Sequence, residues 1–159
     1  MHRKEQVVAV FAAVFCALLV VPSGLAAAKL TPAESGLLRA VNAARAAHGL
    51  GTVRFDATLT RAARSHSAEM VRGNYFAHGA FRTRMIRFHV RGPFVGENLA
   101  WGTGSFASPQ TVIREWLASP EHRANLLRPS FTRIGIGAST GTFLGNGGAT
   151  VLTADFAGR

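Results

Sequence analysis

The spacing of apolar residues changes near position 134, and this change constrains the fold more than any other feature. Upstream, apolar residues recur at helical spacing, whereas Ile134 and Ile136 alternate with Gly135 and Gly137. A period of two is typical of a strand. The Gly-Asn-Gly-Gly run at 145–148 predicts a hairpin turn, because glycine and asparagine tolerate positive φ angles. Helices followed by a terminal hairpin predict an α+β domain built in layers.

Four helix starts are marked by a capping residue, in three cases followed directly by proline. The first also carries a glutamate three residues after the cap, which predicts a capping box. A third strand is expected from Phe94 to Trp101, where apolar residues predominate. The predicted starts are Thr31-Pro32, Asp56, Ser108-Pro109 and Ser119-Pro120, the last opening a short helix through Leu127.

Residues 1–28 have the layout of a secretory signal peptide. A positively charged start precedes an apolar run of 15 residues from Val7 to Val21, and three alanines at 26–28 offer a cleavage site. A membrane-spanning helix needs about 20 apolar residues, so an uncleaved anchor is the less favoured reading. We therefore predict a secreted protein, extracellular or periplasmic, with one domain at 29–159. Its only cysteine, Cys16, lies in the leader, so the domain has no disulfide.

The predicted domain is strongly basic. From Lys29 onward, 16 lysines and arginines face 7 acidic residues, which gives a net charge of +9. Such a surface favours anionic partners, and we expect a cell-envelope polymer or an anionic lipid. The alternative is a generic basic protein with no specific anionic partner. Specific nucleic-acid binding is not expected, because the positive charges accompany no recognised nucleic-acid motif.

One glutamate poses a chemical question. Glu97 lies in the apolar run 94–102, where an unpaired charge would be costly to bury. Two histidines, His78 and His122, also interrupt apolar or turn segments. Two histidines and a carboxylate could hold a divalent metal, or could exchange protons with a substrate without one. Spacing alone does not decide between these chemistries and a structural, hydrogen-bonded role.

Four short segments of the chain form a recognisable set. They are YFAH at 75–78, GENLAWG at 96–102, WLASPEHRANLL at 116–127 and IGIG at 134–137. Taken together, they resemble the bacterial branch of the CAP superfamily, which unites cysteine-rich secretory proteins, antigen 5 and pathogenesis-related type-1 proteins. The resemblance covers roughly positions 31 to 156. It implies a three-layer α-β-α sandwich with a central antiparallel sheet, and an open cleft lined by two histidines and acidic residues that binds zinc in some members.

Carried over by motif, the resemblance makes His78, Glu97 and His122 the cleft residues and the catalytic candidates. His78 and His122 would be the ligands of any zinc. The fuller family pattern has a second glutamate three residues after the tryptophan, where this chain has Ser119. Glu115 does not match that position, so the four-residue site is reduced to three and Ser119 lines the cleft instead.

Two functions of different classes remain open. The favoured one is a binding or envelope-interaction module of unassigned ligand. The alternative is a zinc-assisted hydrolase at the cleft, with Glu97 acting on a water molecule. A Ser119–His122 nucleophile pair is disfavoured, because Ser119 is well placed to cap a helix through its side-chain oxygen. His66 is expected to be a packed or surface residue, and no enzyme activity is assigned.

Overall fold

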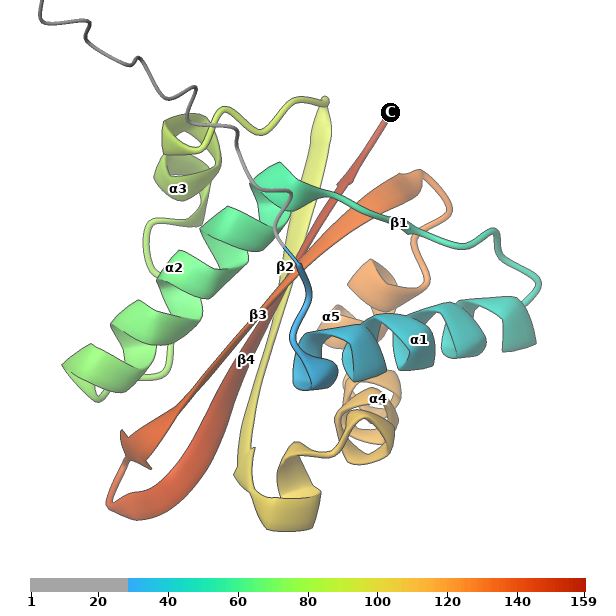
Figure 1. Ribbon diagram of the computed structural model, residues 1–159. Helices are drawn as coiled ribbons and strands as arrows, with labels where there is room; N and C mark the ends of the chain where they lie inside the picture. The colour runs from blue at the N-terminus through green and yellow to red at the C-terminus, as the bar shows by residue number, and fades with distance from the viewer. Residues whose placement is uncertain (1–28) are drawn as a thin grey trace, which may run out of the picture.

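The computed structural model describes residues 29–159, so the signal peptide predicted for residues 1–28 lies outside the described residues. The described part holds five α-helices, one short 3-10 helix and four strands (Figure 1). In chain order they are α1 (Pro32–Ala47), β1 (Arg54–Phe55), α2 (Ala57–Gly73), α3 (Phe81–Arg87), β2 (Phe94–Thr103), η1 (Gly104–Ala107), α4 (Pro109–Ala118), α5 (Pro120–Leu126), β3 (Phe131–Phe143) and β4 (Asn146–Gly158).

The predicted capping residues lie at the N-termini of the observed helices. The backbone N–H of Glu34 donates to the Thr31 hydroxyl (3.3 Å), and the Thr31 N–H donates to the Glu34 carboxylate (2.8 Å), which completes the capping box of α1. Asp56 accepts two backbone N–H groups at the start of α2. Helix α3 was not predicted, and its N-cap residue Ala80 has no side-chain acceptor that would have marked it.

The sheet has the strand order β1-β3-β4-β2, so β2 is an edge strand. The three long strands are antiparallel, as expected, whereas the two-residue β1 adds a parallel partner to β3. Helices α2 and α3 lie on one face of the sheet, and α1, α4 and α5 lie on the other (Figure 1). This is the expected three-layer arrangement.

The hairpin between β3 and β4 turns earlier than predicted. Phe143 pairs directly with Asn146, so the loop consists of Leu144 and Gly145 alone. Both have positive φ, at 47° and 80°, which suits a tight two-residue turn. The predicted turn at 145–148 therefore lies mostly within β4.

The Ile-Gly alternation of β3 places different partners on the two faces of the sheet. Ile134 and Ile136 are buried in the main core, which includes residues of α1 and α4. On the opposite face, a Cβ added to Gly135 would lie 2.1 Å from backbone atoms of Leu59 and Thr60, in the first turns of α2. The two glycines of the alternation thus allow the backbone of α2 to lie directly on the sheet.

Candidate functional site

Glu97 and its neighbour Asn98 point to opposite faces of the edge strand β2, because side chains alternate along a strand. Glu97 is paired across the sheet with Asp155 of β4, beneath the layer formed by α2 and α3. Asn98 faces α5, where its side-chain amide donates to the carbonyl oxygen of His122 (2.9 Å). The cleft residues predicted from the sequence are therefore distributed on both sides of one strand.

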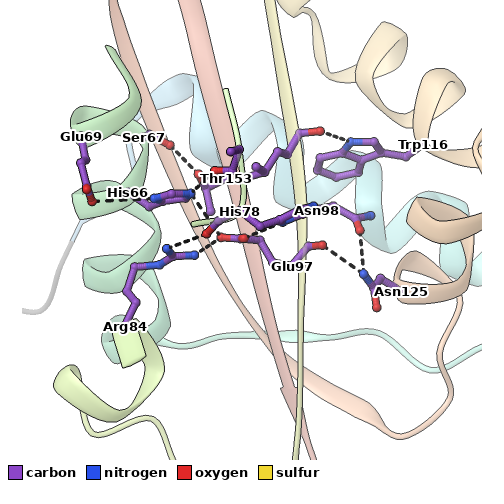
Figure 2. Close-up of polar contacts among 12 residues, drawn as sticks. His66, Ser67, Glu69, His78, Arg84, Glu97, Asn98, Trp116, Asn125 and Thr153 are labelled. Atoms are coloured by element: carbon purple, nitrogen blue, oxygen red, sulfur yellow. Dashed lines mark hydrogen bonds and ion pairs between the residues drawn. The ribbon is translucent and has the colours of Figure 1, made fainter. Parts of the chain in front are cut away.

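The charge of Glu97 is compensated by Arg84 of α3. The Glu97 side chain is only 2% exposed, and one of its oxygens, Oε2, accepts a hydrogen bond from Nη2 of Arg84, which is also buried. The other oxygen, Oε1, lies 2.7 Å from Nδ1 of His78. Figure 2 shows both contacts converging on the carboxylate. Arg84 is not among the residues that the sequence predicts at this site.

His78 is held by the same carboxylate but remains open to solvent. Its side chain is 56% exposed, whereas that of Glu97 is buried. Because a carboxylate oxygen can only accept, Nδ1 of His78 must donate the hydrogen bond. In the neutral ring, the lone pair is therefore on Nε2. Glu97 thus fixes the orientation of His78 and leaves Nε2 able to accept a hydrogen bond from a ligand.

His66 of α2 supports the loop that carries His78. It is fully buried, which agrees with the packed role expected for it, and its Nε2 donates to the carbonyl oxygen of Ala77 (3.0 Å). Burial, together with the nearby charge of Arg84, lowers the pKa of His66, which favours the neutral ring. Nε2 of His66 also lies 3.9 Å from Oε2 of Glu97, so replacing His66 should disturb the site.

Asp155 is the second carboxyl group of this buried cluster. It is completely buried opposite Glu97, and neither of its oxygens has a hydrogen-bond partner within residues 29–159. Burial, followed by the negative charge of Glu97, raises the pKa of Asp155 well above its ordinary value. Asp155 is therefore favoured as a neutral acid, so that Arg84 faces one negative charge rather than two.

His122 lies in the first turn of α5, on the other face of the sheet. Its ring is tilted against the buried Trp116, with the ring centroids 6.5 Å apart. Burial and the charge of His78 lower the pKa of His122, which favours its neutral form. The segment is held by Asn125, whose side-chain amide donates to the backbone carbonyl of Glu97 and to the side-chain oxygen of Asn98, both at 3.0 Å.

A pocket of about 220 Å³ lies beside His122 and extends across the edge strand. Most of the residues that line it are apolar, and Glu115 and His122 are the two titratable residues among them. The sequence interpretation had set Glu115 aside because it does not match the family pattern, but it shares this pocket with Trp116. The aromatic walls of the pocket are Phe76, Trp101, Phe106 and Trp116.

One local expectation was wrong. Ser119 occupies the N-cap position of α5, but its side chain makes no capping hydrogen bond. Gly96 lies within β2, where an added Cβ would be 2.8 Å from Asn125 and from Phe131. Its role is to let α5 and β3 approach closely. The nucleophile pair also gains no support, because no hydrogen bond joins Ser119 to His122 in the described structure.

The side chains at the cleft, as they lie, do not complete a zinc site. Catalytic zinc sites usually supply three protein ligands. Within residues 29–159, no group of three or more His, Cys, Asp and Glu side chains could hold a metal ion. Both carboxylate oxygens of Glu97 are already hydrogen-bonded, one to Arg84 and the other to His78. Of the predicted site residues, only His78 and His122 are therefore left as zinc ligands.

The family follows from comparison of the whole domain with known proteins. The sequence model of the cysteine-rich secretory protein family, abbreviated CAP, matches residues 38–156. The chain belongs to the CAP family. The crystal structure of an extracellular SCP-domain protein from Bacillus anthracis shares this CAP fold at a TM-score of 0.67 and 26% identity, over 82% of this chain and 45% of that one.

Curated relatives support the same assignment and are longer than the region they share. Protein YkwD of Bacillus subtilis is 36% identical over 109 residues, which are 65% of this chain and 41% of that protein. Pathogenesis-related protein 1 of Arabidopsis thaliana is 39% identical over 111 residues, 68% of this chain and 58% of that protein. This CAP chain therefore spans less than two thirds of either relative. In residues 29–159, no helix is long and apolar enough to cross a membrane.

Proposed function

We propose that this CAP protein is a secreted binding module, and that its cleft takes a small ligand with an apolar part and a polar end. The observation that supports this most is the apolar pocket of about 220 Å³ with His122 in its wall. An apolar cavity of about 150 Å³ is large enough to bind benzene. The pocket is thus of a suitable size for a ring or a short chain.

The polar groups around the pocket would orient the ligand. His122, in its favoured neutral form, offers one nitrogen as an acceptor. Across the strand, His78 offers its Nε2, since Nδ1 is bonded to Glu97. A ligand hydroxyl or amide could donate to His122, which lines the pocket, while its apolar part packs against Trp101 and Phe106.

Zinc-assisted hydrolysis is the second candidate function, and one feature favours it. Histidines that bind metals commonly donate their other ring N–H to a carboxylate, as His78 does to Glu97. A zinc ion would activate water at this position. Two histidines are one ligand fewer than the three that a catalytic zinc site usually has. Ligand binding without metal is therefore the stronger proposal.

The proposal is tested by titrating the exported protein with benzyl alcohol, which carries a ring and a hydroxyl group. NMR shifts are expected at Trp101, Trp116 and His122. Phe106→Ala should weaken binding because it removes a wall of the pocket. His122→Ala should weaken binding about 2- to 12-fold, since a net hydrogen bond contributes about 0.5–1.5 kcal/mol. Ile86→Ala is the matched control for Phe106→Ala, because Ile86 is about as exposed as Phe106 but lies outside the pocket.

Zinc is titrated separately to decide between the two candidates. If His78→Ala and His122→Ala each abolish zinc binding to the otherwise folded protein, the metal site gains support. Benzyl alcohol binding that is unchanged in both Phe106→Ala and His122→Ala would rule out the pocket as the ligand site.

A further inference from the structure

Two adjoining hollows near the start of β2 carry arginines and apolar residues but no acidic ones. The first, of about 400 Å³, is lined in part by Arg82, Ile86 and Phe94. The second, of about 600 Å³, includes Arg123 and Leu127 of the α5 region. Arg128 lines both, and no Asp or Glu of the described residues lines either. We call these six residues the arginine-lined surface.

The arginines of this surface lack acidic partners. Elsewhere in the domain, Arg84 forms an ion pair with Glu97, and Arg64 forms one with Glu34. None of the ion pairs in residues 29–159 involves Arg82, Arg123 or Arg128. Their positive charge therefore remains available to an external anion.

The same surface exposes large apolar side chains. Ile86 is 75% exposed and Phe94 is 40% exposed, and both belong to the six large apolar residues exposed in the described part of the chain. The guanidinium of Arg128 lies 5.0 Å from the centre of the Phe94 ring. Arginine and apolar groups are thus combined in one place rather than separated.

This combination identifies the kind of partner. A water-soluble anionic polymer would neutralise the arginines but would leave Ile86 and Phe94 in water. A bilayer with anionic lipids satisfies both, because its phosphates attract arginine and its interfacial layer accepts apolar side chains. Long arginine side chains can lie along apolar surface while their charged ends reach the headgroups.

We propose that the arginine-lined surface docks this protein on the surface of a membrane that contains anionic lipid. Arg82, Arg123 and Arg128 contact headgroup phosphates, and Ile86 and Phe94 enter the interfacial layer. None of His78, Glu97 and His122 lines the two hollows, so this proposal is independent of ligand binding in the cleft.

The test measures binding of the exported protein to vesicles of phosphatidylcholine with and without phosphatidylglycerol. Binding is expected only with phosphatidylglycerol, and it should weaken as salt rises. The double variant Arg82→Gln/Arg123→Gln should bind about 25-fold more weakly, since each arginine near an anionic surface contributes about fivefold. Arg39→Gln/Arg72→Gln is the control, because it removes the same charge from exposed positions of α1 and α2.

Ile86→Ser tests the apolar part, with Phe106→Ser as its control at an equally exposed site outside the surface. Only Ile86→Ser should weaken binding, and both variants should retain the unfolding midpoint of the parent. The proposal is overturned if phosphatidylglycerol vesicles do not bind, or if both arginine pairs cause equal losses. A third outcome would assign the surface to an anionic polymer instead. In that case the protein binds soluble polyphosphate tightly, Ile86→Ser leaves this binding unchanged, and vesicles are bound no more tightly than polyphosphate.

Discussion

Replacing Arg84 by methionine is expected to destabilise the domain by about 3–5 kcal/mol, because it leaves a buried carboxylate without its cation. Glu97 is buried in the layer between α2 and β4, where water cannot replace the lost guanidinium. The neighbouring Asp155 is favoured as a neutral acid and carries no positive charge, so it cannot take the place of the guanidinium. Urea unfolding measures the loss.

The double variant Arg84→Met/Glu97→Gln separates pairing from packing. Removing both charges of a buried pair is often close to neutral, so the double variant should recover much of the loss. Arg82→Met is the matched control, since Arg82 is exposed on the same helix and its change should stay within about 0.5 kcal/mol. If Arg84→Met costs no more than Arg82→Met, then Arg84 does not balance the charge of Glu97.

Replacing Gly135 by alanine should destabilise the domain by about 3 kcal/mol, at the upper end of the usual cost of overpacking. The added Cβ would lie 2.1 Å from backbone atoms of α2, and a helix backbone cannot move aside as a flexible side chain can. Thermal unfolding of the variant gives the measurement.

Gly147→Ala serves as the comparison for Gly135→Ala. Gly147 also lies in a strand of the hairpin, but an added Cβ there would meet nothing within 4 Å. Its stability should change little. Equal unfolding temperatures for the two variants would show that α2 does not need the glycine face of β3.

Capping and periodicity predicted most of the helices and strands, whereas the three-layer arrangement was implied by the family resemblance. Thr31, Asp56 and Ser108 each mark a helix start through a local hydrogen bond that the sequence itself specifies. Helix α3 and strand β1 have no such local signal. The first lacks a capping side chain, and the second has only two residues and depends on pairing with β3.

The candidate site was predictable only in part, because its support comes from residues far apart in the sequence. The motifs pointed to His78 and Glu97, whose side chains are in contact. Arg84 resembled any other arginine in a basic segment, and Asp155 resembled an ordinary polar residue of a strand. Only the pairing of β2 with β4 places Asp155 opposite Glu97. That register cannot be read from local spacing.

The edge position of β2 also explains why the three predicted residues do not meet at one point. Glu97 lies on the face covered by α2, whereas His122 comes from the helices on the other face. Burial is the main cause that lowers the pKa of His122, and the charge of His78 lowers it further. The cleft therefore presents two histidines in different settings, one fixed by a carboxylate and one beside an apolar pocket.

We infer that Glu97 orients His78 so that Nε2 of the neutral ring can accept a hydrogen bond from a ligand. Nitrogen-15 NMR of the histidine rings tests it directly, because it shows which ring nitrogen carries the hydrogen in the neutral form. We predict that neutral His78 carries its hydrogen on Nδ1, and that Glu97→Gln weakens this preference while the fold is retained. A hydrogen found mainly on Nε2 of neutral His78 in the unaltered protein would contradict the claim.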